Sequence, residues 1–221
     1  MGLFRTAVCA GIGMALCMLG CNSDGCIDGS GPIVSESIDL FTFDGFDFQA
    51  AGEVTVVPAT TQQVVVRGEQ NIIDALNRDV LNGVWNIGFT ECVGQVSELR
   101  VEISLPELRS VTLSGAGTID AETEASAIET VLSGAGTVTL SGRSASQSIA
   151  LEGSGTVEAF DLVTDETTVL LSGQGSVNVT ANEQLNADLT GSGSVLYKGD
   201  PRLNVRITGA GSVVDANSVQ D

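Results

Sequence analysis

The amino-acid sequence predicts an all-β protein built as a right-handed parallel β-helix, or solenoid, with coils of about 19 residues. Three observations lead to this fold class. A short glycine motif returns six times at nearly constant spacing, and glycine is abundant, at 27 of 221 residues, while aromatic residues make up only 4%. Val, Thr, Ser and Leu recur between the motifs. Such a mixture favours short strands and tight turns.

The repeat occupies residues 111–215 and has the pattern apolar, x, Gly, x, Gly, x, apolar. The first glycines of successive copies are separated by 19, 19, 20, 18 and 18 residues. A period of this length suits one coil of a parallel β-solenoid, with two or three short strands joined by turns and every coil stacked on the last. The motif glycines are Gly115, Gly117, Gly134, Gly136, Gly153, Gly155, Gly173, Gly175, Gly191, Gly193, Gly209 and Gly211.

The same repeat predicts how the coils stack. The apolar residues before the motif should form one internal ladder and those after it a second, with successive members about 4.8 Å apart. Glycine suits the sharp bend because it takes a positive φ or lets neighbouring backbones approach without a Cβ. No copy continues into a phosphate-binding loop, so no nucleotide cofactor is predicted. The first ladder is Leu113, Leu132, Leu151, Leu171, Leu189 and Ile207, and the second is Ile119, Val138, Val157, Val177, Val195 and Val213.

Residues 33–110 lack the motif but still contain strand-like segments. Residues 54–57 and 64–67 flank a turn at Pro58 and are predicted to form a hairpin or a strand, turn and strand. We expect this N-terminal segment to start or cap the solenoid, since an open first coil would leave an unpaired edge. Further expectations are strands at 84–89 and 99–105, a helical segment within 71–80, and core positions for some of Phe41, Phe43, Phe46 and Phe48.

Residues 1–20 have the features of a lipoprotein signal peptide. Arg5 is followed by an apolar run, residues 7–19, that is too short to span a bilayer. The run ends in Met18-Leu19-Gly20-Cys21, which resembles a bacterial lipobox although its first two positions depart from the usual residues. We therefore expect lipidation of Cys21 and membrane attachment through that lipid. Ordinary signal-peptide cleavage and an uncleaved anchor are the alternatives.

The residues that follow Cys21 bear on location and on the redox environment. Asn22 replaces the Asp that retains many lipoproteins in the inner membrane, which favours the outer membrane. Residues 21–32 are rich in Gly, Ser and Asp, which predicts a flexible tether. Cys26 and Cys92 are a candidate disulfide, and the sequence leaves open whether they pair. The chain has no His and no CxxC pair, so neither a zinc site nor a redox motif is predicted.

The charge excludes one class of partner. The formal net charge is −19, or −20 without the leader, because Arg5 is the only charged residue within it. Such a surface repels nucleic acid, so no nucleic-acid partner is expected. The acidic residues are dispersed, which is typical of a solvated surface, with divalent-cation binding as the alternative.

Several segments of the sequence together resemble a known family. They are the Asp44-Gly45-Phe46 start, the valine-rich segment after it, residues 72–76, the Trp85-Asn86-Ile87 strand and the SGAG repeats. This family is described as "Putative auto-transporter adhesin, head GIN domain", and the resemblance covers residues 38–215. It implies one β-helix-like domain, over residues 33–221, in a secreted or lipid-anchored bacterial protein. It carries over no catalytic or ligand-binding residue.

The function expected from these features is that of a non-catalytic cell-envelope lipoprotein whose solenoid presents a binding surface to a glycan or another envelope protein. A polysaccharide-active β-helix enzyme and a structural envelope scaffold of associated solenoids are the alternatives. An enzyme would need paired acids beside aromatic sugar-binding faces.

The candidates for such chemistry are few. The acid pairs are Asp120 with Glu122 and Glu158 with Asp161, and Trp85 and Tyr197 are the only Trp and Tyr residues. Ser114, Ser133 and Ser172 occupy repeated positions in a chain without a His to activate them. We therefore predict no catalytic residue.

Overall fold

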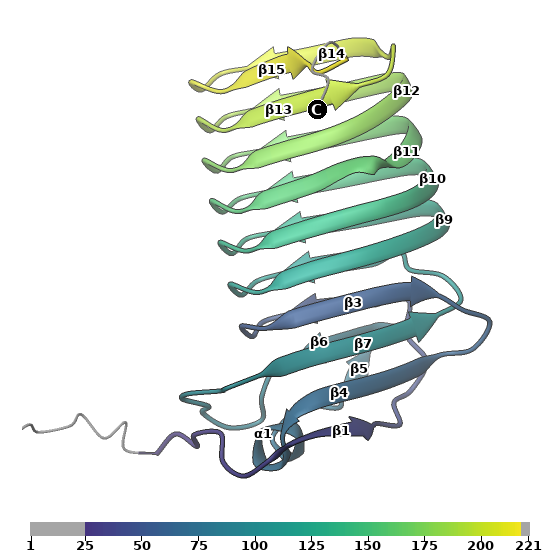
Figure 1. Ribbon diagram of the computed structural model, residues 1–221. Coiled ribbons are helices and arrows are strands. Elements are labelled where there is room, and N and C mark those ends of the chain that lie inside the picture. Colours follow the sequence, from purple (N-terminus) through teal and green to yellow (C-terminus); the bar gives the residue numbers. More distant parts are fainter. Residues whose placement is uncertain (1–24, 218–221) are drawn as a thin grey trace, which may run out of the picture.

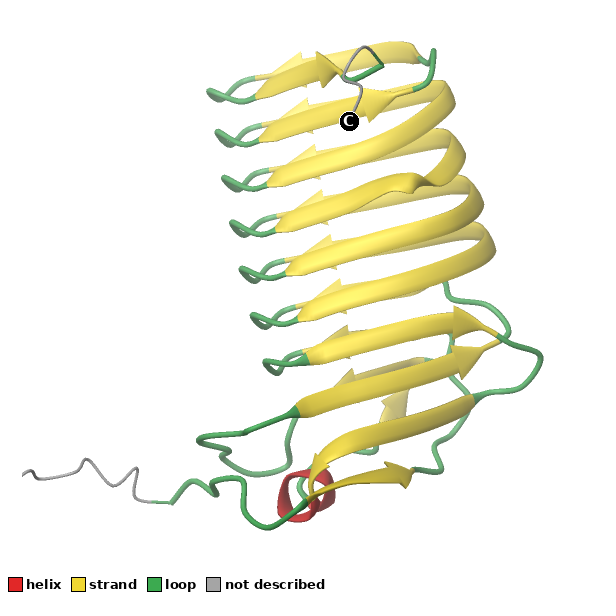
Figure 2. Ribbon diagram, in the orientation of Figure 1, coloured by secondary structure: helices red, strands yellow, loops and turns green. Residues whose placement is uncertain are grey.

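The computed structural model describes residues 25–217, so the predicted signal peptide and Cys21 lie outside the described residues. The chain forms a parallel β-solenoid flattened into two faces, with the coils stacked in one column (Figures 1 and 2). One sheet of 15 strands winds around the core. The predicted fold class is confirmed. We call the edge that carries the glycine motifs the turn edge, and the opposite edge the bend edge.

Each central coil is one long strand of 14 to 16 residues, where two or three short strands were expected. The strand runs along the first face, curves at the bend edge and returns along the second face (Figure 2). Parallel pairing continues around the curve, for example between Arg143 and Glu124. These four strands are β9 (Thr118–Leu132), β10 (Thr137–Leu151), β11 (Thr156–Leu171) and β12 (Ser176–Leu189).

The last coils are split at the bend edge. β13 (Ser194–Lys198) continues the first face and β14 (Arg202–Ile207) continues the second. Gly199 lies between them with a φ of 97°, a conformation that favours glycine. β15 (Ser212–Asp215) then pairs with β13 and ends the stack.

Both predicted ladders exist and form the core up to Leu189 and Val195, whereas their last members, Ile207 and Val213, are exposed and partly buried, respectively. Ile119, Val138 and Val157 lie in register along the first face, and Leu132, Leu151 and Leu171 along the second. All six side chains are buried. The alternation of buried and exposed residues on both faces is what a strand with one solvated side requires.

The motif glycines are needed because successive turns nearly touch. A Cβ on Gly153 would collide with the carbonyl oxygen of Gly134, one coil earlier, and a Cβ on Gly155 would collide with that of Gly136. None of the twelve motif glycines has a positive φ. Of the two reasons expected for glycine here, close approach of backbones therefore applies.

The bend edge has a polar interior. Thr164 and Thr167 are buried and their hydroxyl groups lie 2.6 Å apart, while Thr164 also donates to the carbonyl oxygen of Thr180. The buried Thr123 hydroxyl donates to the carbonyl oxygen of Leu108. These side chains satisfy backbone groups where the strand curves.

The N-terminal cap does not follow the order of the chain. On the first face the strands run β1 (Ile33–Ser37), β4 (Gln63–Glu69), β7 (Leu99–Leu105), β3 (Glu53–Pro58) and then β9. β7 lies between β3 and β4, parallel to the first and antiparallel to the second. The hairpin alternative for these segments is wrong and the strand, turn and strand alternative is confirmed, because residues 59–62 are long enough to pass over one intervening strand.

The second face of the cap shows the same reordering. The strands run β5 (Val80–Leu81), β6 (Val84–Ile87), β2 (Gly45–Phe48), β8 (Ser110–Leu113) and then the return segment of β9. β6 and β7 form the lowest coil, and the earlier strands β2 and β3 form the coil above it (Figure 1).

The rest of the cap closes the lower end. The helix expected within 71–80 is only α1 (Gln70–Asp74), because Leu76 bridges to Phe89 and Val80 enters β5. The segments expected at 84–89 and 99–105 are β6 and β7. Of the four phenylalanines, Phe43, Phe46 and Phe48 are in the core with Trp85, and Phe41 is exposed.

We expect Gly153→Ala to lower the free energy of unfolding by about 1–3 kcal/mol, because the new methyl group forces two coils apart. Urea unfolding of the variant and the wild type measures the difference. Ser154→Ala, between the two glycines of the same motif, is the matched control and should change stability little. Equal stability of Gly153→Ala and wild type would show that the coils are not in contact at the turn edge.

Candidate functional site

A cleft lies where the turn edge is interrupted. In the repeats, four residues such as 133–136 connect the second face to the first, and residues 49–52 do the same between β2 and β3. In the lowest coil, residues 88–98 form an expanded loop between β6 and β7. A cleft of about 730 Å³ separates this loop from the turn at 49–52.

The turn at 49–52 is a modified copy of the repeat motif. Phe48 pairs with Leu113 and Glu53 pairs with Thr118, so Ala50, Ala51 and Gly52 take the places of Gly115, Ala116 and Gly117. Gly115 cannot carry a Cβ because the carbonyl oxygen of Ala50 is too close. Ala50 carries a methyl group where the repeats have none, and it is one of the residues that line the cleft between the turn and the loop.

The cleft is lined by apolar side chains and bordered by charged ones. The apolar part comes from both sides, with Ala50 and Ala51 on the turn and Phe89, Val93 and Val96 on the loop.

Two ion pairs border the cleft. Arg100 Nη2 lies 2.9 Å from Glu53 Oε2, and Arg67 Nε lies 3.0 Å from Glu98 Oε1. Both pairs are partly exposed, so each contributes little to stability and remains accessible to a ligand.

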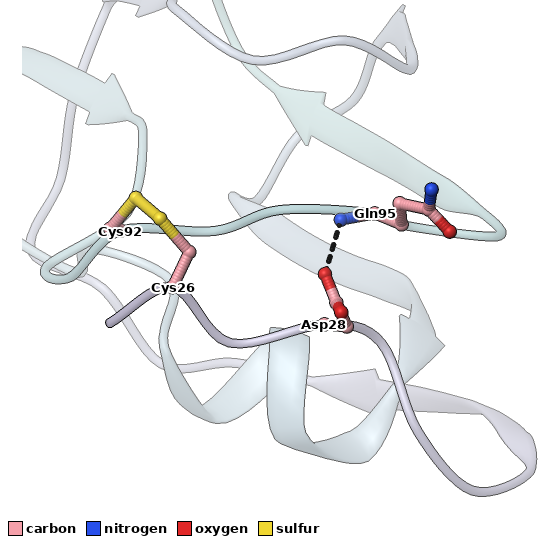
Figure 3. The surroundings of a disulfide bond; sticks show 4 residues. All are labelled: Cys26, Asp28, Cys92 and Gln95. Atoms are coloured by element: carbon pink, nitrogen blue, oxygen red, sulfur yellow. Dashed lines mark hydrogen bonds between the residues drawn. A yellow bond between two sulfur atoms is a disulfide. The ribbon is translucent and has the colours of Figure 1, made fainter. Parts of the chain in front are cut away.

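A disulfide holds the expanded loop in place. Cys92 in the loop is bonded to Cys26, which settles the pairing that the sequence left open (Figure 3). Around it the chain pairs like a strand: Ile27 N–H donates to the carbonyl oxygen of Cys92 at 2.9 Å, and Gly94 N–H donates to that of Ile27 at 2.8 Å. The carboxylate of Asp28 accepts from the N–H of Gln95 at 2.8 Å (Figure 3).

These contacts shorten the predicted flexible tether. Residues 26–30 are bound to the loop and to Asn71, whose side chain accepts from Ser30 N–H and donates to the carbonyl oxygen of Asp28. The prediction of a flexible tether over 21–32 is therefore wrong for this part, because the disulfide and the backbone pairing immobilise it.

A buried carboxylate supports the base of the loop. Glu69, between β4 and α1, accepts a hydrogen bond from Ser97 N–H at 3.0 Å and is buried. Hydrogen bonds from Ser97 and from nearby backbone N–H groups lower the pKa of Glu69 below its ordinary value of 4.5, more than burial raises it. A Cβ at Gly29 would lie 2.6 Å from Glu69 Oε1, so this glycine allows residues 26–30 to cross the carboxylate.

Comparison with known proteins now identifies the family. The sequence profile described as "Putative auto-transporter adhesin, head GIN domain" matches residues 42–201. The chain belongs to this family. The family description indicates a surface or envelope protein with a binding role.

Solved structures share the fold of this head GIN domain protein. A putative adhesin from Bacteroides fragilis is 18% identical with a TM-score of 0.66, and the match covers 86% of this chain and 99% of the other. A putative adhesin from Parabacteroides merdae (17%, TM-score 0.53) covers the same shares. A putative lipid binding protein from Parabacteroides distasonis (19%, TM-score 0.55) covers 86% and 98%. No curated protein sequence matches the chain.

The candidate catalytic residues of this head GIN domain protein lie outside the cleft. Asp120 and Glu122 are exposed on the outer surface of β9. Glu158 accepts a hydrogen bond from the Asn178 side chain at 2.7 Å, one coil above, and Asp161 is exposed where the register of β11 shifts. The cleft lining includes neither pair.

Neither the Trp nor the Tyr side chain lies fully exposed beside these acids. Trp85 is buried and its indole N–H donates to the carbonyl oxygen of Asn77 at 2.9 Å. Tyr197 is partly buried against the core.

The candidate serines lie along the turn edge. Ser114 donates to the carboxylate of Asp47 at 2.8 Å, and Ser133 and Ser172 border a shallow groove beside the motif glycines. Among residues 25–217, no group of three or more His, Cys, Asp or Glu side chains is placed to hold a metal ion. No helix within the same residues is long and apolar enough to cross a membrane.

We expect Glu69→Gln to destabilise the protein at about pH 7 and to lose this effect in acid. Because the pKa of Glu69 in the folded state is below 4.5, its carboxylate contributes stability that is fully present above that value and is lost as pH falls through the folded pKa. Urea unfolding of both proteins from about pH 7 to about pH 3 tests this, since the difference should shrink below the ordinary pKa. If the difference in unfolding free energy between the two proteins stays constant from about pH 7 to about pH 3, the Glu69 carboxylate does not have a lowered pKa in the folded state.

Proposed function

We propose that this protein is a non-catalytic binding module, held at the outer membrane by a lipid on Cys21, whose ligand enters the cleft between residues 49–52 and 88–98. The observation that carries the proposal is the replacement of one tight turn by a disulfide-braced loop, which opens a concave site at the turn edge. Binding sites are typically concave and combine apolar lining with a few polar groups.

The lining favours a ligand that has both apolar and hydrogen-bonding surface. Phe89, Val93 and Val96 offer apolar contact, and Arg100 and Glu53 offer a charged donor and acceptor at the rim. An envelope glycan, with its apolar ring faces and hydroxyl groups, meets both requirements. The description of a structural neighbour as a putative lipid binding protein favours an envelope lipid as the second candidate ligand.

The predicted anchor would place this cleft close to the membrane. Only four residues separate Cys21 from Cys26, and five extended residue-to-residue steps span at most about 18 Å. Because Cys26 is bonded to the cleft loop, a lipid on Cys21 would hold the loop within that distance of the bilayer surface. The cleft would then lie within reach of molecules at the membrane surface.

We expect Ala51→Trp to weaken ligand binding at least about tenfold, which corresponds to 1.4 kcal/mol, because the indole fills the cleft from an exposed turn position. The two probes are soluble envelope polysaccharide and vesicles of envelope phospholipid, immobilised for surface plasmon resonance. Ala135→Trp, which occupies the same place in a repeat turn, is the matched control. If Ala51→Trp binds like the wild type, the ligand does not use this cleft; if neither probe binds the wild type, neither proposed ligand class is correct.

The anchor is tested by mass spectrometry of the protein purified from membranes of an expressing cell. We expect a mature N-terminus at Cys21 that carries diacylglycerol, and we expect Cys21→Ser to abolish that modification. Retention of residue 1, or cleavage elsewhere without lipid, would rule out the lipoprotein assignment and leave a secreted or membrane-embedded protein.

A further inference from the structure

The end of the solenoid opposite the cap exposes residues that are core residues in every coil below. Leu203, Val205 and Ile207 of β14 are 48%, 39% and 43% exposed. Their partners in β12, Leu185, Ala187 and Leu189, are almost fully buried. β14 and β15 also have no strand beyond them within residues 25–217. The open end, where β14 and β15 are the last strands of the column (Figure 1), thus presents an apolar strip beside unpaired strand edges.

The chain after β15 does not cover this end as far as the structure describes it. Ala216 N–H donates to the carbonyl oxygen of Tyr197, and the side chain of Asn217 bonds to both the N–H and the carbonyl oxygen of Gly199. Residues 216–217 therefore turn back onto the coil below. An open strand edge with exposed apolar residues is normally covered by another element or another chain.

The charge distribution identifies what can cover it. Residues 25–195 contain 24 acidic and 5 basic residues, whereas residues 196–217 contain two acidic and three basic ones. Two copies of this acidic protein repel each other over most of their surfaces, and the open end is where that repulsion is weakest. Arg206, one of these three basic residues, lies 3.8 Å from Asp188 of β12 and offsets its negative charge.

We infer that the open end associates with the open end of a second copy, forming a dimer about a two-fold axis perpendicular to the solenoid axis. Such an axis reverses strand direction, so the terminal strands of the two copies would meet antiparallel and bury both apolar strips. Head-to-tail contact would instead join the open end to the cap. On the second face the edge strand of the cap is β5, which has only two residues and is antiparallel to β6, so it does not match β14 in length or direction. This dimer does not depend on the proposed ligand or on the lipid anchor.

The test is sedimentation equilibrium of the full chain, purified from membranes in density-matched detergent, over a range of protein concentrations. We expect a reversible monomer-dimer equilibrium. Val205→Glu and Val205→Lys should each lower the association constant at least about tenfold, because either charge would be buried at the apolar contact. Leu170→Glu, which makes the same change at an exposed position on the outer side of β11, should leave it unchanged.

Three results would overturn the inference. A monomer at every concentration excludes the dimer, and an equal effect of Leu170→Glu shows that the contact lies elsewhere. An open series of oligomers that is disrupted by Leu81→Glu, at an exposed position of β5 in the cap, indicates head-to-tail stacking instead. Thermal unfolding of each variant at a dilute, monomeric concentration verifies that the fold is intact, which is expected because residue 205 is already partly exposed.

Discussion

The contact between successive turn backbones determines how this molecule is built. At each motif, the carbonyl oxygen of one coil occupies the space that a side chain of the next coil would need. Glycine is thus required by a neighbour that lies some 19 residues away in sequence and one strand spacing away in space. The two internal ladders align because these turns stack directly, and the flat faces follow from the ladders.

The candidate site lies where this requirement is relaxed at one of the two motif positions. Below the turn at 49–52 the next connection is an expanded loop, and Ala50 takes the place of the first glycine, whereas Gly52 still lies against the carbonyl oxygen of Leu99. The disulfide between Cys26 and Cys92 keeps the loop away from the turn and at the same time joins the N-terminal segment to it. One local departure from the repeat therefore produces both a concave surface and a short connection to the predicted anchor.

The repeat half of the fold could be predicted because its information is local and repeated. Leu132 and Val138 flank one motif, and their equivalents recur often enough to establish the ladders. The continuous strand through the bend edge has no comparable signal, since residues 123–127 share no motif with the equivalent residues 142–146 of the next coil. The cap was predicted only as a set of segments, because the position of β7 between β3 and β4 depends on pairing between distant residues.

The candidate site was missed for a related reason. The sequence 48–54 keeps the second glycine of the motif and the flanking apolar residues, but Ala50 hides the match. Recognising it as a repeat would have shown that the turn after β6 departs from the pattern. The burial of Glu69 and its contact with Ser97 depend on tertiary packing, and neither residue stands out in the sequence.

The non-sequential order of the cap has a consequence for how the chain reaches its native state. The coil of β2 and β3 lies between a coil made from later residues, β6 and β7, and another that begins with β8. This part cannot assemble progressively as the chain emerges from an export channel, because its lower neighbour arrives after it. The motif coils can each add to a completed neighbour. Folding during export should therefore have one slow step, which ends when residues up to about Leu113 are available, followed by rapid growth along the column.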